Sequence, residues 1–84
     1  MAQQVHFDTV AHWATKDAEL VVSGRHAYGR QAEIRMRLID RMEKVSTKEK
    51  YSLYEEYCKQ LDKEIRRLAP SGNFRSTMPT PQFS

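Results

Sequence analysis

Residues 30–69 read RQAEIRMRLIDRMEKVSTKEKYSLYEEYCKQLDKEIRRLA, and this stretch decides the fold. It contains neither Gly nor Pro and is rich in Glu, Lys, Arg, Leu and Met, which all favour helix. The apolar residues of its second half follow a heptad spacing of the kind found in coiled coils. They are Tyr51, Tyr54, Cys58, Leu61, Ile65 and Leu68. The stretch is therefore expected to be helical throughout, as one helix or two.

The apolar stripe of the first half is out of register with the heptad stripe. Leu38, Met42 and Val45 lead, by the same spacing, to Glu49 rather than to Tyr51. A single rod would have to change its buried face at this point. The phase break therefore predicts two helices packed as a hairpin, with Leu38 and Met42 near the heptad stripe.

The break coincides with a capping box in the residues STKE at 46–49. The Ser46 hydroxyl can accept a hydrogen bond from the Glu49 amide, and the Glu49 carboxylate can reach back. At the far end, Pro70 forbids continuation of the helix. We expect an all-α fold with hairpin helices at about 27–45 and 47–69, joined by a tight turn.

The N-terminal segment is expected to form an additional helix at about 8–22. Asp8 or Thr9 can cap it, and its apolar face would be Val10, Trp13, Ala14, Ala18 and Val21. A competing interpretation makes residues 5–10 and 20–22 short strands, because both are rich in β-branched residues. After Pro70, residues 70–84 should form an irregular tail in which Phe74, Met78 and Phe83 could act as surface anchors.

The composition indicates one small domain, residues 1–69, followed by that tail. The chain has 84 residues, of which 39% are hydrophobic and 30% charged. This balance is typical of a soluble globular protein, and the sequence has neither a membrane-spanning run nor a signal-peptide core. The single cysteine, Cys58, excludes an intrachain disulfide. We expect a cytoplasmic protein that does not bind membranes.

No motif predicts an enzyme, a cofactor site or a metal site. Residues 24–31 have the glycine spacing of a phosphate-binding loop, but Arg30 and Gln31 stand where Lys and a hydroxyl residue are needed. The three histidines lack the further ligands that a metal requires. Cys58 lies on the heptad face, where burial makes a thiol unreactive.

Four cations of the middle helix, Arg30, Arg37, Arg41 and Lys44, lie on one side and could hold the phosphates of a nucleic acid. Against this interpretation, Glu33 precedes Arg37 by four residues and Asp40 precedes Lys44 by four. Pairs at this spacing neutralise each other within a helix. The net charge is only +3.

Two polar residues, Gln31 and Arg35, fall inside the apolar arc of the middle helix. A polar group there must find a partner or reach solvent. Arg35 can extend its stem out of the hairpin seam to solvent. Alternatively, Gln31 and Arg35 face a second subunit or a partner protein, and Arg35 forms an ion pair across that interface.

Tyrosines gather at the start of the last helix and suit an interface, because each has a large apolar ring with a polar tip. Tyr51 and Tyr54 belong to the heptad seam, whereas Leu53 and Tyr57 point away from it. We expect Leu53 and Tyr57 to form an exposed interface patch. If the first helix packs over this flank, both residues are core instead.

These patterns together predict a noncatalytic protein-binding module, such as a small helical regulator, inhibitor or assembly factor that acts through a hairpin surface. The heptad face could also support a homo-oligomer. The size would suit a phage or plasmid accessory protein. The alternative is a small basic protein that binds nucleic acid through the cations of the middle helix.

Overall fold

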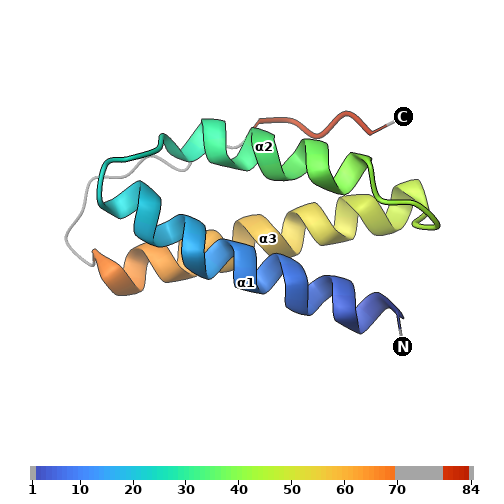
Figure 1. The fold of residues 1–84 in the computed structure, drawn as a ribbon, viewed down its shortest axis with the longest axis horizontal. Coiled ribbons are helices and arrows are strands. Elements are labelled where there is room, and N and C mark those ends of the chain that lie inside the picture. The colour runs from blue at the N-terminus through green and yellow to red at the C-terminus, as the bar shows by residue number, and fades with distance from the viewer. Residues whose placement is uncertain (1, 70–78, 84) are drawn as a thin grey trace.

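The structure, a computed structural model, describes residues 2–69 and 79–83 of the chain. These residues form three helices, α1 at Ala2–Val22, α2 at Tyr28–Asp40 and α3 at Thr47–Leu68, with no strand among them (Figure 1). The expected all-α fold with an N-terminal helix and a hairpin is confirmed. The alternative with short strands in the N-terminal segment is wrong. No helix of the described part is long and apolar enough to cross a membrane.

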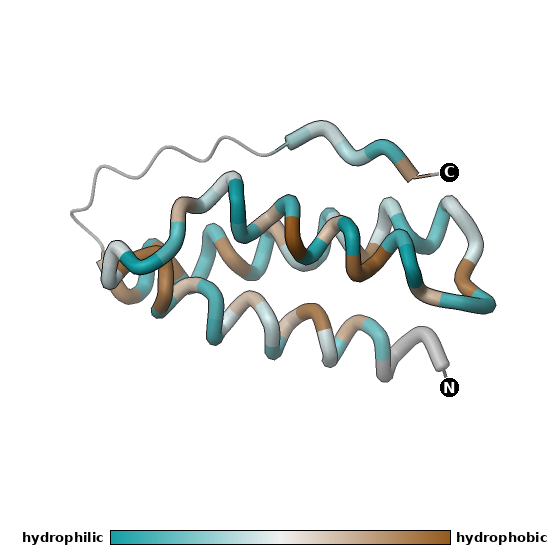
Figure 2. The backbone as a smooth tube through the Cα atoms, turned by 45° about the horizontal axis from the view of Figure 1, so that its top comes forward, coloured by the Kyte–Doolittle hydropathy of each residue, from teal (hydrophilic) through white to brown (hydrophobic). Residues whose placement is uncertain are grey.

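The core lies mainly between α1 and α3. Val10, Ala14 and Ala18 of α1 are fully buried, as expected, and belong to one core cluster with Leu53, Tyr57 and Leu61 of α3. The small alanine side chains let the two helix backbones approach closely. Helix α2 packs against α3 and diverges from α1 as the two helices leave their connection (Figure 2). The α1 and α3 pair is therefore the main structural unit.

Helix α1 starts six residues earlier than the sequence predicted. Asp8 and Thr9 lie inside the helix instead of capping it. Phe7 packs against the core, three residues before the buried Val10. The apolar stripe therefore extends one further turn towards the N-terminus, and the helix extends with it.

Helix α1 ends at a Schellman motif. Gly24 has a φ of +80°, a conformation that costs glycine little. Its N–H donates to the carbonyl of Val21 at 3.1 Å, and the N–H of Arg25 donates to the carbonyl of Leu20 at 3.0 Å. The second glycine of this region, Gly29, lies in the first turn of α2 rather than in a loop.

The connection between α2 and α3 is six residues long, 41–46, and the predicted tight turn is wrong. Helix α2 ends at Asp40 instead of Val45, and Lys44 adopts a left-handed φ of 62°. The Nζ of Lys50 donates to the carbonyl oxygen of Asp40 at 2.7 Å and so satisfies the helix end. Val45 still packs against the core, but from irregular chain. The Ser46 cap is confirmed, because its Oγ accepts from the Glu49 amide at 3.2 Å.

The expected hairpin seam is altered because α2 turns a different face to the bundle. Its buried residues are Tyr28, Gln31, Ala32 and Ile39, whereas Leu38 is 38% exposed. Tyr28 holds α2 to α3 through a hydrogen bond of 2.7 Å from its hydroxyl to Asp62. The prediction that Leu38 packs in the seam is wrong, although Met42 does pack against the core.

The described end of the tail, residues 79–83, has no regular secondary structure, as expected. Phe83 is 9% exposed and packs against Tyr51 and Tyr54 of α3. This segment and the N-terminus lie at the same end of the bundle (Figure 1). The two other proposed tail anchors, Phe74 and Met78, lie outside the described residues.

Candidate interaction site

A buried polar cluster of Asp17, Arg35 and Tyr57 joins the three helices. Arg35 donates to Asp17 through two bonds, Nε to Oδ2 at 2.8 Å and Nη2 to Oδ1 at 3.0 Å. The hydroxyl of Tyr57 donates to Oδ2 of the same carboxylate at 2.7 Å. The guanidinium also lies 4.7 Å from the ring centroid of Trp13. The interpretation of Arg35 as a partner-facing residue is wrong, because its ion pair lies within the chain.

The cluster is electrostatically consistent. Asp17 is fully buried, and a buried carboxylate needs a paired charge and hydrogen bonds to remain ionised. The hydrogen bonds from Arg35 to Asp17 raise the pKa of the guanidinium, and burial with the bond to Asp17 raises the pKa of the Tyr57 hydroxyl. Arg35 therefore stays charged and the Tyr57 hydroxyl keeps its proton at neutral pH.

Sequence reasoning did not single out Asp17, yet a signal for it was present. Asp17 falls inside the apolar arc of α1, between Ala14 and Val21, as Arg35 falls inside that of α2. Opposite charges in the apolar arcs of two packed helices can satisfy each other across the seam. That pairing could have been proposed from the sequence alone.

Gln31 is the least satisfied polar residue of the buried set. It is 5% exposed, and its Oε1 is a buried polar atom without a hydrogen-bond partner in the described part of the chain. An unpaired buried oxygen costs free energy. The structure thus supplies a partner for Arg35, but none for this oxygen of Gln31.

Leu53 and Tyr57 do not form an exposed patch, so that prediction is wrong. Leu53 is 2% exposed and Tyr57 is fully buried. Helix α1 covers this flank of α3, which is the alternative stated above for both residues. The other flank, with Tyr54, Cys58, Leu61 and Ile65, is also buried. The heptad face is therefore used within the chain, and a homo-oligomer through it would have to displace these contacts.

Three residues of the heptad stripe have different surroundings. Tyr51 is 39% exposed, whereas Tyr54 is 3% exposed and close to the tail. The thiol of Cys58 is buried, which raises its pKa to about 11. It is therefore protonated at neutral pH and serves as a packing group.

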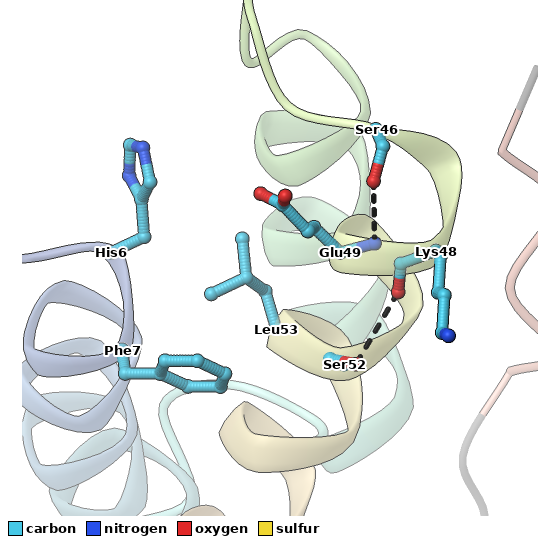
Figure 3. A pocket seen from close by; sticks show the side chains of 7 residues that line it. All are labelled: His6, Phe7, Ser46, Lys48, Glu49, Ser52 and Leu53. Carbon is cyan, nitrogen blue, oxygen red and sulfur yellow. Dashed lines mark hydrogen bonds between the residues drawn. The ribbon is translucent and has the colours of Figure 1, made fainter. Parts of the chain in front are cut away.

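A cavity of about 330 Å³ opens between the N-terminal half of α1 and the start of α3 (Figure 3). Phe7 and Leu53 supply its apolar side. Its two serines already bond to the backbone of α3, since Ser46 accepts from the Glu49 amide and Ser52 donates to the Lys48 carbonyl. Both serine hydroxyls are thus engaged by the backbone of α3, and Ser46 is its N-cap.

The largest exposed feature of α2 combines apolar and basic side chains. Ile34 and Leu38 are each 38% exposed and lie one turn apart. Arg30, Arg37 and Arg41 are exposed and adjoin them at spacings of three and four residues. We call these five residues the α2 face.

The cations of the middle segment are not neutralised as expected. Asp40 contacts Lys50 at 3.8 Å, and Lys44 lies beyond the end of α2, where the spacing of four no longer brings the side chains together. Glu33 and Arg37 form no ion pair either. Within residues 2–69 and 79–83, Arg30, Arg37, Arg41 and Lys44 are therefore exposed without a salt bridge.

No protein family, curated protein or solved structure matches this chain. The function must therefore be argued from the exposed surfaces. Among the described residues, no group of three or more His, Cys, Asp or Glu side chains is placed to hold a metal ion. The α2 face is the feature that offers both apolar area and unpaired charge.

Proposed function

We propose that this chain is a noncatalytic helical module that binds a protein partner through the α2 face. The observation that carries the proposal is the exposure of Ile34 and Leu38 beside Arg30, Arg37 and Arg41. Apolar side chains with arginine are enriched at protein interfaces. An acidic amphipathic helix would complement this face, because its apolar stripe would cover Ile34 and Leu38 while its carboxylates met the guanidinium groups.

The position of α2 in the bundle supports this proposal. Ile34 and Leu38 lie on the opposite flank of the helix from Asp40. Asp40 reaches Lys50 of α3, so the flank with Ile34 and Leu38 points away from this part of α3. A partner helix could lie along α2 there without displacing a core residue.

Affinity capture with the tagged chain, compared with a double variant, tests the proposal. Ile34→Ser with Leu38→Ser removes the apolar centre of the α2 face, and Leu68→Ser on α3 is the matched control because Leu68 is 36% exposed. We expect a partner that is captured by the natural chain and by the control but lost with the double variant. Equal capture by all three chains would contradict the proposal.

A second candidate function is binding to nucleic acid. It rests on the exposure of Arg30, Arg37, Arg41 and Lys44 without an intramolecular salt bridge in the described residues. Each phosphate contact would release counterions and make the affinity depend on salt. Replacing Arg37 and Arg41 by Glu should weaken binding and flatten that dependence. No binding of the natural chain to DNA or RNA at low salt would remove this candidate.

The two candidates separate in one further step. Nuclease treatment of captured material releases a nucleic-acid partner, or any protein bridged by it, and leaves a direct protein complex intact. Sedimentation of the natural chain over a range of concentrations shows in parallel whether the partner is a second copy.

A further inference from the structure

The end of the tail is docked on α3 by specific contacts. The ring of Phe83 meets Tyr51 edge-on at a centroid distance of 5.1 Å and Tyr54 at 6.2 Å, both at 77°. The hydroxyl of Tyr54 donates to the carbonyl oxygen of Pro79 at 3.1 Å. The anchors at Pro79 and Phe83 therefore hold both ends of a short extended segment, PTPQF at 79–83.

The docked segment does not fill the space that it covers. A cavity of about 300 Å³ remains between the tail and α3. Tyr54, Glu55 and Cys58 line it on the side of α3, and residues 79–81 line it on the other side. The site on α3 is thus larger than the present occupant requires.

The chemistry of the contacts matches a known way in which proteins recognise extended peptides. Proline fixes the backbone φ, so a segment with Pro79 and Pro81 loses little conformational entropy when it docks. Aromatic rings accept the apolar rings of such a segment, while a hydroxyl donor binds a backbone carbonyl. Here Tyr51 and Tyr54 make their ring contacts with Phe83, and the Tyr54 hydroxyl is the donor to the carbonyl of Pro79.

We propose that the face of α3 formed by Tyr51, Tyr54, Glu55 and Cys58 is a docking site for an extended segment of another protein that contains proline and phenylalanine. Residues 79–83 occupy this site as an intramolecular competitor. Because residues 79–83 belong to the same chain as the site, their effective concentration there is on the order of millimolar, so a partner must bind better than the tail does. A larger segment could bind more tightly than the tail by filling this cavity.

Titration of a labelled peptide with the sequence PTPQFS into full-length chains tests the proposal. In the natural chain the tail competes with the peptide, whereas Phe83→Ala weakens the competitor without changing α3. We expect Phe83→Ala to bind the peptide about tenfold more tightly than the natural chain does. A peptide in which alanine replaces phenylalanine is the matched ligand control and should not bind.

A second variant tests the site itself. Tyr54→Phe, added to Phe83→Ala, keeps the ring but removes the hydroxyl donor, and it should weaken peptide binding by about fivefold. Circular dichroism and thermal melts show that the variants remain folded. The double variant of the α2 face should bind the peptide as the natural chain does, which separates this site from the proposed function.

Two results would overturn the proposal. One is that Phe83→Ala binds the peptide no more tightly than the natural chain, or that Tyr54→Phe leaves the affinity unchanged. The other is that the natural chain forms dimers in sedimentation that Phe83→Ala abolishes. That outcome would assign the site to the tail of a second copy.

Discussion

Helices α1 and α2 are held in the bundle by different means. Helix α1 contributes a stripe of fully buried apolar residues that includes Val10, Ala14 and Ala18. Helix α2 contributes Tyr28, Ala32 and Ile39, and the polar residues Gln31 and Arg35 share its inward face. The sequence of α2 has the stronger helix signal, yet its apolar packing is thinner. Helix propensity and contribution to the core are therefore separate properties in this chain.

The largest effect should come from removing the carboxylate that links the two helices. Asp17→Ala leaves the guanidinium of Arg35 and the hydroxyl of Tyr57 without their buried acceptor. Loss of one partner of a buried pair costs about 3 to 5 kcal/mol in free energy of unfolding. Urea denaturation followed by circular dichroism measures the loss. Asp8→Ala, at an exposed position of the same helix, is the control and should change stability by less than about 0.5 kcal/mol.

Replacing the whole cluster tests whether the stability lost in Asp17→Ala can be recovered. A chain with Asp17→Leu, Arg35→Met and Tyr57→Phe replaces the whole cluster by apolar groups, which often restores stability. We expect it to be more stable than Asp17→Ala. If Asp17→Ala unfolds at the same urea concentration as the natural chain, the cluster does not hold α2 to α1.

Leucine-to-alanine substitutions compare the core under α1 with the outer face of α2. Leu53 is 2% exposed and lies beneath α1, so Leu53→Ala should cost about 3 kcal/mol. Leu38 is 38% exposed, and Leu38→Ala should cost under about 1 kcal/mol. Thermal melts measure the stability of both variants, and sedimentation of the same samples measures their association. A nearly unchanged melt for Leu53→Ala, with altered association, would restore the earlier interpretation of Leu53 as an interface residue.

The two connections between helices can be compared through their left-handed residues. Gly24→Ala places a side chain at a φ of +80°, where the added Cβ meets no neighbouring atom within 4 Å. Its cost is therefore that of the backbone alone, about 1 kcal/mol. Lys44 has a φ of 62°, so Lys44→Gly should relieve strain and raise stability by about 0.5 kcal/mol. We expect Gly24→Ala to lower the melting temperature and Lys44→Gly to raise it. Shifts of the same sign would contradict a left-handed backbone at both residues.

A further prediction concerns the unpaired oxygen of α2. Gln31→Met keeps the length of the side chain and removes the buried Oε1 that has no partner. We expect a gain of up to about 1 kcal/mol, which in a domain of this size raises the melting temperature by about 4 to 8 °C. A lower melting temperature would indicate that the Gln31 amide makes a favourable contact in solution.

Local signals in the sequence predicted the helices well where they acted alone. The Ser46 cap and the start of α3 each depend on neighbours within four residues, and the structure confirms them. The end of α2 was predicted five residues too late. It depends on Lys50, which lies in the next helix and satisfies the carbonyl of Asp40.

Predictions that depended on which helices meet were less successful. Leu53 and Tyr57 were expected to be exposed because only one neighbour was counted for α3. Helix α3 instead has α1 on one flank and α2 with the tail on the other, so a wider arc is buried. The α2 face was recognised in part, through its arginines, but not through Ile34 and Leu38. Leu38 was assigned to the seam by spacing, and only the observed rotation of α2 shows it exposed beside Ile34.

Trp13 is the only tryptophan of the chain, and its ring lies against the guanidinium of Arg35. Its fluorescence therefore reports on the contact between α1 and α2, while far-ultraviolet circular dichroism reports on the helices as a whole. If α2 separates before the α1 and α3 pair melts, the emission will change at a lower denaturant concentration than the ellipticity. The chain thus contains an intrinsic optical probe at the junction where its apolar packing is thinnest.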